Sequence, residues 1–87
     1  MRAKALVAFP GGYGTLDELF EALTLLQTRK IEPVPVILFG TKFWKDLIDF
    51  EYLVNEGTIN EEDIDLFVYC DKAKDAWDYI RNFKYSK

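Results

Sequence analysis

Histidine is absent from this 87-residue sequence, and Cys70 is its only cysteine. Without histidine, the chain by itself cannot form a Ser-His-Asp triad or a Cys-His dyad. It also lacks the ligands of a Cys/His zinc site, and we expect no metal. A single cysteine excludes the internal disulfides on which small secreted scaffolds depend. We therefore expect a protein of a reducing compartment, most simply the cytoplasm.

Long hydrophobic runs and an excess of positive charge are also missing. No uninterrupted apolar run exceeds five residues, whereas roughly 20 are needed to span a bilayer, so we expect no membrane partner. The N-terminus lacks the apolar core and the cleavage site of a signal peptide. The formal net charge is −4, which argues against a nucleic-acid partner. The length suits one small domain, and 49% hydrophobic residues suit a globular one.

Short apolar runs alternate with helical patterns along the whole chain. Three runs have the length and the Gly or Pro borders of buried strands: 5–9, 34–39 and 65–70. The second strand is expected to begin at or just after Pro35, because proline donates no ladder hydrogen bond. Three stretches have apolar residues at helical spacing: 15–29, 43–55 and 73–83. This β-α-β-α-β-α order predicts an α/β fold, a three-layer Rossmann-like half-domain with parallel strands.

Several polar residues are predicted to begin or end these helices. Arg29 would lie in the last turn of the first helix, and Gly57 would stop the second. Asn60 would cap a short helical turn over 61–63, and Asp71 would cap the last helix. Other residues have ordinary core roles. Trp44 and Trp77 are expected in the core because they share helical spacing with apolar neighbours, and Cys70 is expected to be an inert buried thiol.

One segment carries chemistry: Pro10-Gly11-Gly12-Tyr13-Gly14-Thr15-Leu16-Asp17-Glu18. It lies where the first strand ends and the first helix begins. Its glycines allow a tight turn and close approach to a ligand, and a helix start offers unpaired N–H groups to an anion, most naturally a phosphate. The segment is not a Walker sequence, since no Lys-Ser or Lys-Thr follows the glycines. It is not the dinucleotide fingerprint either, since Asp17 replaces the third glycine.

Two plainer interpretations of this segment stay open. Thr15 and Glu18 match a capping box, in which both side chains satisfy backbone N–H groups at a helix start. The glycines would then form only a tight turn between strand and helix. Tyr13 either covers a ligand or is an exposed loop aromatic.

The full segment resembles the signature Pro-Gly-Gly-x-Gly-Thr-x-x-Glu of the Lonely Guy family. These are the cytokinin riboside 5′-monophosphate phosphoribohydrolases, often labelled "possible lysine decarboxylase". All six specified positions match: Pro10, Gly11, Gly12, Gly14, Thr15 and Glu18. The resemblance runs from about Arg2 to Phe83. Family members are longer, and this chain is similar to their C-terminal half, so we expect residues 1–87 to be the second half of a Rossmann-like nucleotide-binding domain.

The resemblance implies a hydrolase that splits the N-glycosidic bond of a nucleoside 5′-monophosphate such as AMP into a free base and ribose 5-phosphate. By resemblance, Gly11, Gly12, Gly14 and Thr15 hold the phosphate, and Tyr13 belongs to the same nucleotide-binding loop. Glu18 is then the catalytic carboxylate, facing the ribose. No cofactor is implied. Lysine decarboxylation would need an electron sink such as pyridoxal phosphate, and no lysine here has a supporting motif.

Part of the family pattern falls outside the chain. The family's catalytic arginine precedes the motif by more residues than are present here, so its role is not transferred to Arg2. We therefore expect the fragment to be inactive by itself. The alternatives are a non-catalytic phosphate- or nucleotide-binding module, and a chain that pairs with a separate N-terminal half. An exposed first strand and the Leu-rich helix 15–29 also favour a homo-oligomer.

Overall fold

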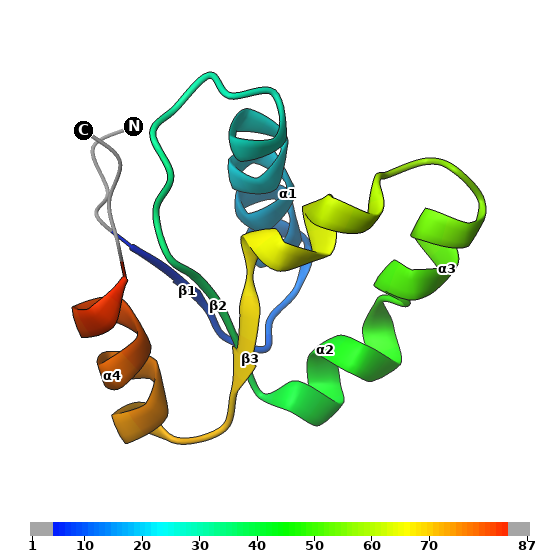
Figure 1. Cartoon of the computed structure of the whole chain (residues 1–87). Helices are drawn as coiled ribbons and strands as arrows, with labels where there is room; N and C mark the ends of the chain where they lie inside the picture. Colours follow the sequence, from blue (N-terminus) through cyan, green and yellow to red (C-terminus); the bar gives the residue numbers. More distant parts are fainter. Residues whose placement is uncertain (1–4, 84–87) are drawn as a thin grey trace.

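A single parallel sheet of three strands organises the chain (Figure 1). The computed structural model describes residues 5–83. Its elements follow in the order β1 (Leu6–Ala8), α1 (Tyr13–Gln27), β2 (Val36–Phe39), α2 (Thr41–Leu47), α3 (Phe50–Asn55), the 3₁₀ helix η1 (Glu61–Leu66), β3 (Val68–Cys70) and α4 (Ala73–Asn82). The strand order is β1-β2-β3, with both pairings parallel. The predicted α/β class and the start of the second strand just after Pro35 are confirmed.

Helices cover both faces of this sheet, which gives the predicted three layers (Figure 1). Val36 and Leu38 pack on the side of α1, α2, α3 and η1. Ile37 points to the opposite side, where it packs with residues of α4. All three side chains are fully buried, as expected for a central parallel strand. Within residues 5–83, no helix is both long and apolar enough to cross a membrane.

The first strand lies at an edge of the sheet. Among residues 5–83, β1 pairs with β2 alone, through Leu6↔Val36, Val7↔Ile37 and Ala8↔Leu38. This edge position was expected from the chain order. The C-terminal end of β1 leads directly into the glycine-rich segment, so that segment stands at one open corner of the described sheet.

The predicted continuous helix over 43–55 is wrong. The chain forms two helices there, because Ile48 and Asp49 are extended and interrupt the helical hydrogen bonding. The Asp49 carboxylate accepts a hydrogen bond from the backbone N–H of Tyr52 at 3.0 Å and so starts α3. Short polar side chains compete with the helical ladder in this way. The break also changes the helical phase, and Leu47 is left 49% exposed instead of facing the core.

Other element ends differ from the predictions by a few residues. α1 begins at Tyr13 and ends at Gln27, so Arg29 lies beyond the last turn. Arg29 has a left-handed φ of 59°, and the following N–H, of Lys30, donates to the carbonyl of Leu25 at 2.9 Å. Gly57 ends α3 as predicted, with a φ of 76°.

The last third of the chain also differs in detail. β3 is shorter than the expected run 65–70, because Asp65 and Leu66 belong to η1. The helical turn after Asn60 is present and extends to Leu66. Trp77 is 60% exposed, which contradicts the expected core position. Its neighbours Ala76, Tyr79 and Ile80 face the sheet instead, and Trp77 is rotated off that stripe.

Candidate functional site

The glycine-rich segment joins β1 to α1 at the carboxyl edge of the sheet. Gly12 is the N-cap residue of α1, and its carbonyl accepts the first helical hydrogen bond from Leu16 at 3.1 Å. The first N–H groups of a helix have no partner within the helix and carry a partial positive charge. In open parallel sheets, ligands bind outside this same edge. The segment thus begins a helix at the carboxyl edge of the sheet, which is where the sequence predicts a phosphate to bind.

The capping-box interpretation of Thr15 and Glu18 is wrong. No side chain caps α1, whose N-cap is a glycine, and Thr15 is already the third helical residue. Glu18 lies in the second turn, out of reach of the N-cap N–H. The first turn of α1 contains no acidic residue. The carboxylate of Glu18 thus has no capping role.

Thr15 and Glu18 instead line one hollow of about 170 Å³ beside β1. They lie three positions apart, which places both side chains on one face of α1. The hollow is completed by strand and loop residues and by one further helix residue: Leu6, Val7, Ala8, Phe9, Pro10 and Leu19. Thr15 is half-buried there and Glu18 is exposed. The structure therefore brings the hydroxyl and the carboxylate of the motif to one place, at the end of the edge strand.

The other predicted site residues lie around the start of α1, outside this hollow. Tyr13 is 93% exposed, so in this structure it is an exposed aromatic at the first helical position. Gly11 lies against Thr15: a Cβ on Gly11 would collide with Thr15 Oγ1 and lie 3.1 Å from Thr15 Cβ. Packing against the Thr15 side chain therefore favours glycine at position 11.

Gly12 and Gly14 differ from Gly11 in this respect. A Cβ at either position would meet no other part of the chain within 4 Å. Neither has the positive φ that only glycine adopts readily, since the positive-φ glycines among the described residues are Gly40 and Gly57. The fold itself therefore does not require these two glycines. The open space at both positions leaves the backbone accessible to a ligand.

Gly40, which follows β2, and Trp44 of α2 support the segment from behind. Gly40 follows β2 with a φ of 98°, and a Cβ on it would lie 3.2 Å from Cγ of Pro10. The indole Nε1 of Trp44 donates to the carbonyls of Ala8 at 3.2 Å and Phe39 at 3.1 Å. The sequence analysis used Gly40 only as the border of the second strand, although a glycine at a strand often marks a place where other backbone approaches closely. It placed Trp44 in the core, where the side chain is fully buried, but did not foresee its hydrogen bonds.

Asp71 and Cys70 lie at the same edge of the sheet. Asp71 does not cap α4, whose N-cap is Lys72. Its carboxylate accepts from Thr41 instead, at the start of α2. Cys70 is buried as predicted, and burial raises the pKa of its thiol, with smaller contributions from Asp75 and Asp71. A raised pKa disfavours the reactive thiolate.

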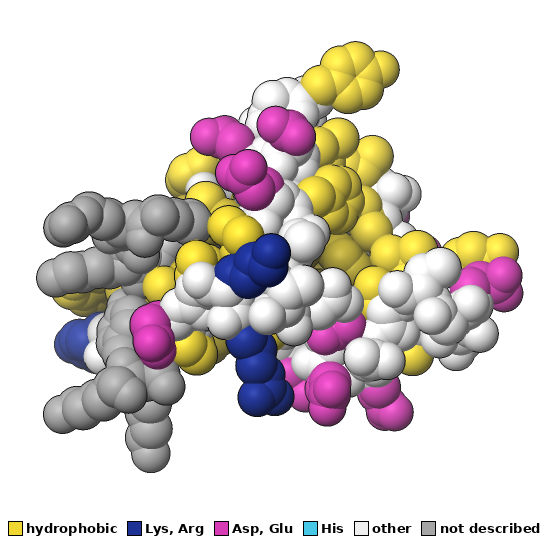
Figure 2. Space-filling model, turned by 90° about the horizontal axis from the view of Figure 1, so that it is seen from above, with side chains coloured by type: hydrophobic (Ala, Val, Ile, Leu, Met, Phe, Trp, Pro, Cys, Tyr) yellow, Lys and Arg dark blue, Asp and Glu magenta, His cyan; other side chains and the backbone are white. Residues whose placement is uncertain are grey.

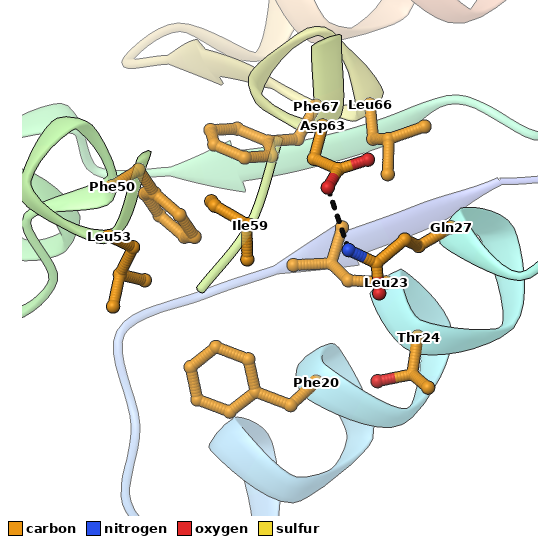
Figure 3. A pocket seen from close by; sticks show the side chains of 10 residues that line it. All are labelled: Phe20, Leu23, Thr24, Gln27, Phe50, Leu53, Ile59, Asp63, Leu66 and Phe67. Carbon is orange, nitrogen blue, oxygen red and sulfur yellow. Dashed lines mark hydrogen bonds between the residues drawn. The ribbon is translucent and has the colours of Figure 1, made fainter. Parts of the chain in front are cut away.

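A second hollow, of about 160 Å³, lies between α1, α3 and η1 (Figure 3). Its walls are mostly apolar. On the face of the molecule seen from above, hydrophobic side chains gather beside acidic ones (Figure 2). Gln27 Nε2 donates to Asp63 Oδ2 at 2.7 Å across one side. Seven apolar and three polar residues line it: Phe20, Leu23, Phe50, Leu53, Ile59, Leu66, Phe67, Thr24, Gln27 and Asp63. None of the predicted site residues is among them.

The ionisable groups near the motif are few. Arg2 lies outside the described residues, so the structure does not place it. Among residues 5–83, no group of three or more His, Cys, Asp or Glu side chains is arranged to hold a metal ion. Glu18 is the one ionisable residue in the lining of the hollow beside β1.

Comparison with known proteins identifies the family to which the sequence is similar. A family model described as "Possible lysine decarboxylase" matches residues 1–80. The chain is 32% identical over 84 residues to a probable cytokinin riboside 5′-monophosphate phosphoribohydrolase, LOGL3, of Oryza sativa subsp. japonica. It is 37% identical over 73 residues to the cytokinin riboside 5′-monophosphate phosphoribohydrolase LOG1 of Arabidopsis thaliana. A rice enzyme of the same name, LOG, is 42% identical over 62 residues.

These matches cover most of this chain but a minor part of each relative. The aligned residues are 94%, 82% and 69% of this chain, in the same order. They are 39%, 34% and 25% of the relatives. The chain thus spans about two fifths or less of the length of the curated relatives it matches.

Proposed function

Because this chain belongs to the family described as possible lysine decarboxylase, we propose that it is the phosphate-binding and carboxylate-bearing part of a nucleoside 5′-monophosphate phosphoribohydrolase. Water would attack C1′ of the ribose, and the N-glycosidic bond would break. The base would leave with a proton, and ribose 5-phosphate would be the second product. Relatives named as phosphoribohydrolases support this reaction over decarboxylation.

The phosphate would bind at the start of α1. Gly12 and Gly14 leave the backbone open, and the N–H groups of the first turn face the same region. The hydroxyl of Thr15 adds a hydrogen-bond donor at the rim of the hollow. Gly11 has a different role in this proposal, because it holds Thr15 in place by close packing. The loop needs no lysine, since backbone donors and the helix dipole suffice to hold an anion.

Glu18 would act on the ribose. One helical turn separates it from Thr15 on the same face of α1, so a phosphate at Thr15 sets the sugar beside the carboxylate. A carboxylate there stabilises an oxocarbenium-like transition state or orients the attacking water, as in glycoside hydrolysis. The shared hollow of Thr15 and Glu18 is the observation on which this proposal chiefly rests.

The base-binding walls would come from beyond the described residues. A hollow of about 170 Å³ is smaller than the roughly 300–1,000 Å³ typical of ligand sites. It opens beside the free edge of β1, where a further parallel strand can pair. We propose that an N-terminal half, or a second copy of the chain, completes the site there. In this proposal residues 1–87 form the C-terminal half of the nucleotide-binding domain.

Replacement of Glu18 tests the proposal. In the polypeptide that its source cells produce, Glu18→Gln should abolish release of adenine from AMP while AMP binding survives. Glu21→Gln is the matched control, since Glu21 is exposed one turn further along α1, and its activity should equal wild type. Release should be followed by chromatography, and binding by calorimetry. Near-normal turnover by a folded Glu18→Gln variant would contradict the catalytic role.

A non-catalytic nucleotide-binding module is the second candidate. This candidate is supported by the lining of the hollow beside β1, where the Thr15 hydroxyl and the Glu18 carboxylate are the polar side-chain groups among apolar residues. Such a lining would suffice to bind a nucleotide without cleaving it. AMP binding without base release by the wild-type polypeptide, with unchanged affinity in Glu18→Gln, would favour this module over the hydrolase.

A further inference from the structure

Two strands end next to the glycine-rich segment, and one buried side chain bonds to both ends. Ala8 is the last residue of β1, and its carbonyl accepts from Trp44 Nε1 at 3.2 Å. Phe39 is the last residue of β2, and its carbonyl accepts from the same N–H at 3.1 Å. The indole therefore makes a shared hydrogen bond that joins the carboxyl ends of neighbouring strands.

The position of Trp44 is itself well defined. Its side chain has no exposed surface, and it belongs to the main core with Leu19 and Leu38. The ring packs edge-on against Phe43, with centroids 5.1 Å apart. A buried aromatic held on all sides has little freedom, so its N–H is a fixed donor.

The two residues that carry these carbonyls lie directly before the loops that form the candidate site. Ala8 precedes the loop that runs through Pro10 and Gly11 into α1. Phe39 precedes Gly40, whose missing Cβ allows Pro10 to lie against it. A shift of either strand end would move Pro10, and with it the start of α1. No contact of Trp44 with the phosphate region is needed for this effect.

From this geometry we propose that Trp44 is a positioning residue for the phosphate-binding segment: its indole N–H fixes the ends of β1 and β2 and thereby the backbone of Gly11 and Gly12. The proposal rests on the proposed function for its ligand, but the ordering of the segment can be measured without any ligand. Tryptophan suits this place because it combines a large apolar body with one donor.

Removal of the N–H with the shape preserved is the direct test. β-(3-Benzothienyl)alanine at position 44 keeps the bicyclic ring and replaces the N–H with sulfur; Trp44→Phe is the genetic counterpart. Phe50→Leu is the matched control, because Phe50 is also buried in the main core but packs against Phe67, away from the segment. Urea unfolding should confirm that each variant folds and show how much stability it loses.

The first readout is the backbone order of Gly11 and Gly12 in ¹⁵N relaxation. We expect order parameters to fall from about 0.85 to below about 0.6 without the N–H. They should stay at the wild-type value in Phe50→Leu, even at equal loss of stability. Wild-type order in the benzothienyl variant would overturn the proposal.

The second readout is AMP affinity. We expect the dissociation constant to rise about tenfold without the N–H, because the loss of one hydrogen bond leaves the segment less ordered before AMP binds. In Phe50→Leu the dissociation constant should rise by less than about twofold. If wild-type chain fails to bind AMP, the proposed function fails, while the order parameters still decide the role of Trp44. If AMP binds all variants equally, Trp44 does not position the segment.

Discussion

Asp71 and Thr41 are joined by two hydrogen bonds across the carboxyl edge of the sheet, although 30 residues separate them. The backbone N–H of Thr41 donates to one carboxylate oxygen at 2.8 Å, and its hydroxyl donates to the other at 2.7 Å. The loop after β3 thus caps α2 instead of the helix that follows it. This link ties the loop after β2 to the loop after β3, beside Gly40.

The link makes stability depend on pH in the acid range. The hydroxyl of Thr41, then its N–H, hold the pKa of Asp71 below its ordinary value, and Lys45 adds a smaller effect. The unfolded chain therefore takes up this proton first as the pH falls. The stabilisation is complete above the ordinary value of about 3.9 and is lost as the pH falls through the lowered value.

Asp71→Asn should remove this part of the acid dependence. The variant should be less stable than wild type at neutral pH, and the difference should shrink as the pH falls below about 4. Urea unfolding from pH 6 to pH 2.5 measures both. Asp65→Asn, at an exposed position of η1, is the control and should follow wild type. A difference for Asp71→Asn that stays constant with pH would contradict the assignment.

Gly14 and Gly11 should respond in opposite ways to a methyl group. Gly14 lies in the first turn of α1 with open space around it, so Gly14→Ala should stabilise the fold by about 0.5 kcal/mol, because alanine favours the helix. The same methyl should weaken AMP binding if the phosphate approaches the backbone there. Thermal unfolding measures the change in stability, and a titration with AMP measures the change in affinity.

Gly11→Ala is the comparison for that experiment. Its methyl would collide with Thr15, so the variant should lose about 1–3 kcal/mol of stability. AMP binding at full strength in a stabilised Gly14→Ala variant would argue against close approach of a ligand at Gly14.

Arg29 and Gly57 hold the same left-handed position after two different helices. Their φ angles are 59° and 76°. Arg29→Gly should raise the free energy of unfolding by about 1 kcal/mol, because glycine relieves the clash of a Cβ in this conformation. Gly57→Ala should lower it by a similar amount, about 1 kcal/mol. Arg29→Ala keeps the Cβ while removing the charge, and it should change stability by less than about 0.5 kcal/mol. Equal unfolding curves for Arg29→Gly and Arg29→Ala would rule out the conformational effect.

The place of the candidate site followed from the sequence with few assumptions. Three glycines between a strand pattern and a helix pattern identify a loop at a helix start, and the strand order puts it at the carboxyl edge. Whether Glu18 caps the first helix did not follow from the sequence. Thr15 and Glu18 at i and i+3 fit a capping box and a shared helix face equally well, and only the observed start of α1 at Tyr13 separates the two. Likewise, spacing cannot tell that Gly11 touches Thr15 while Gly12 and Gly14 face open space.

By itself the sequence determined the alternation of strands and helices, the parallel sheet and the place of the glycine-rich segment between β1 and α1, because hydrophobic periodicity and turn residues act locally. Tertiary structure decided the rest. Asp71 bonds to Thr41 and Trp44 bonds to Ala8 across 30 and 36 residues, and no local pattern records such partners. Trp77 is exposed although its helical spacing matches the core, because the sheet contacts Ala76, Tyr79 and Ile80. The local sequence pattern determines whether a helix or a strand forms, whereas contacts with residues distant in the sequence determine which side chains are buried or hydrogen-bonded.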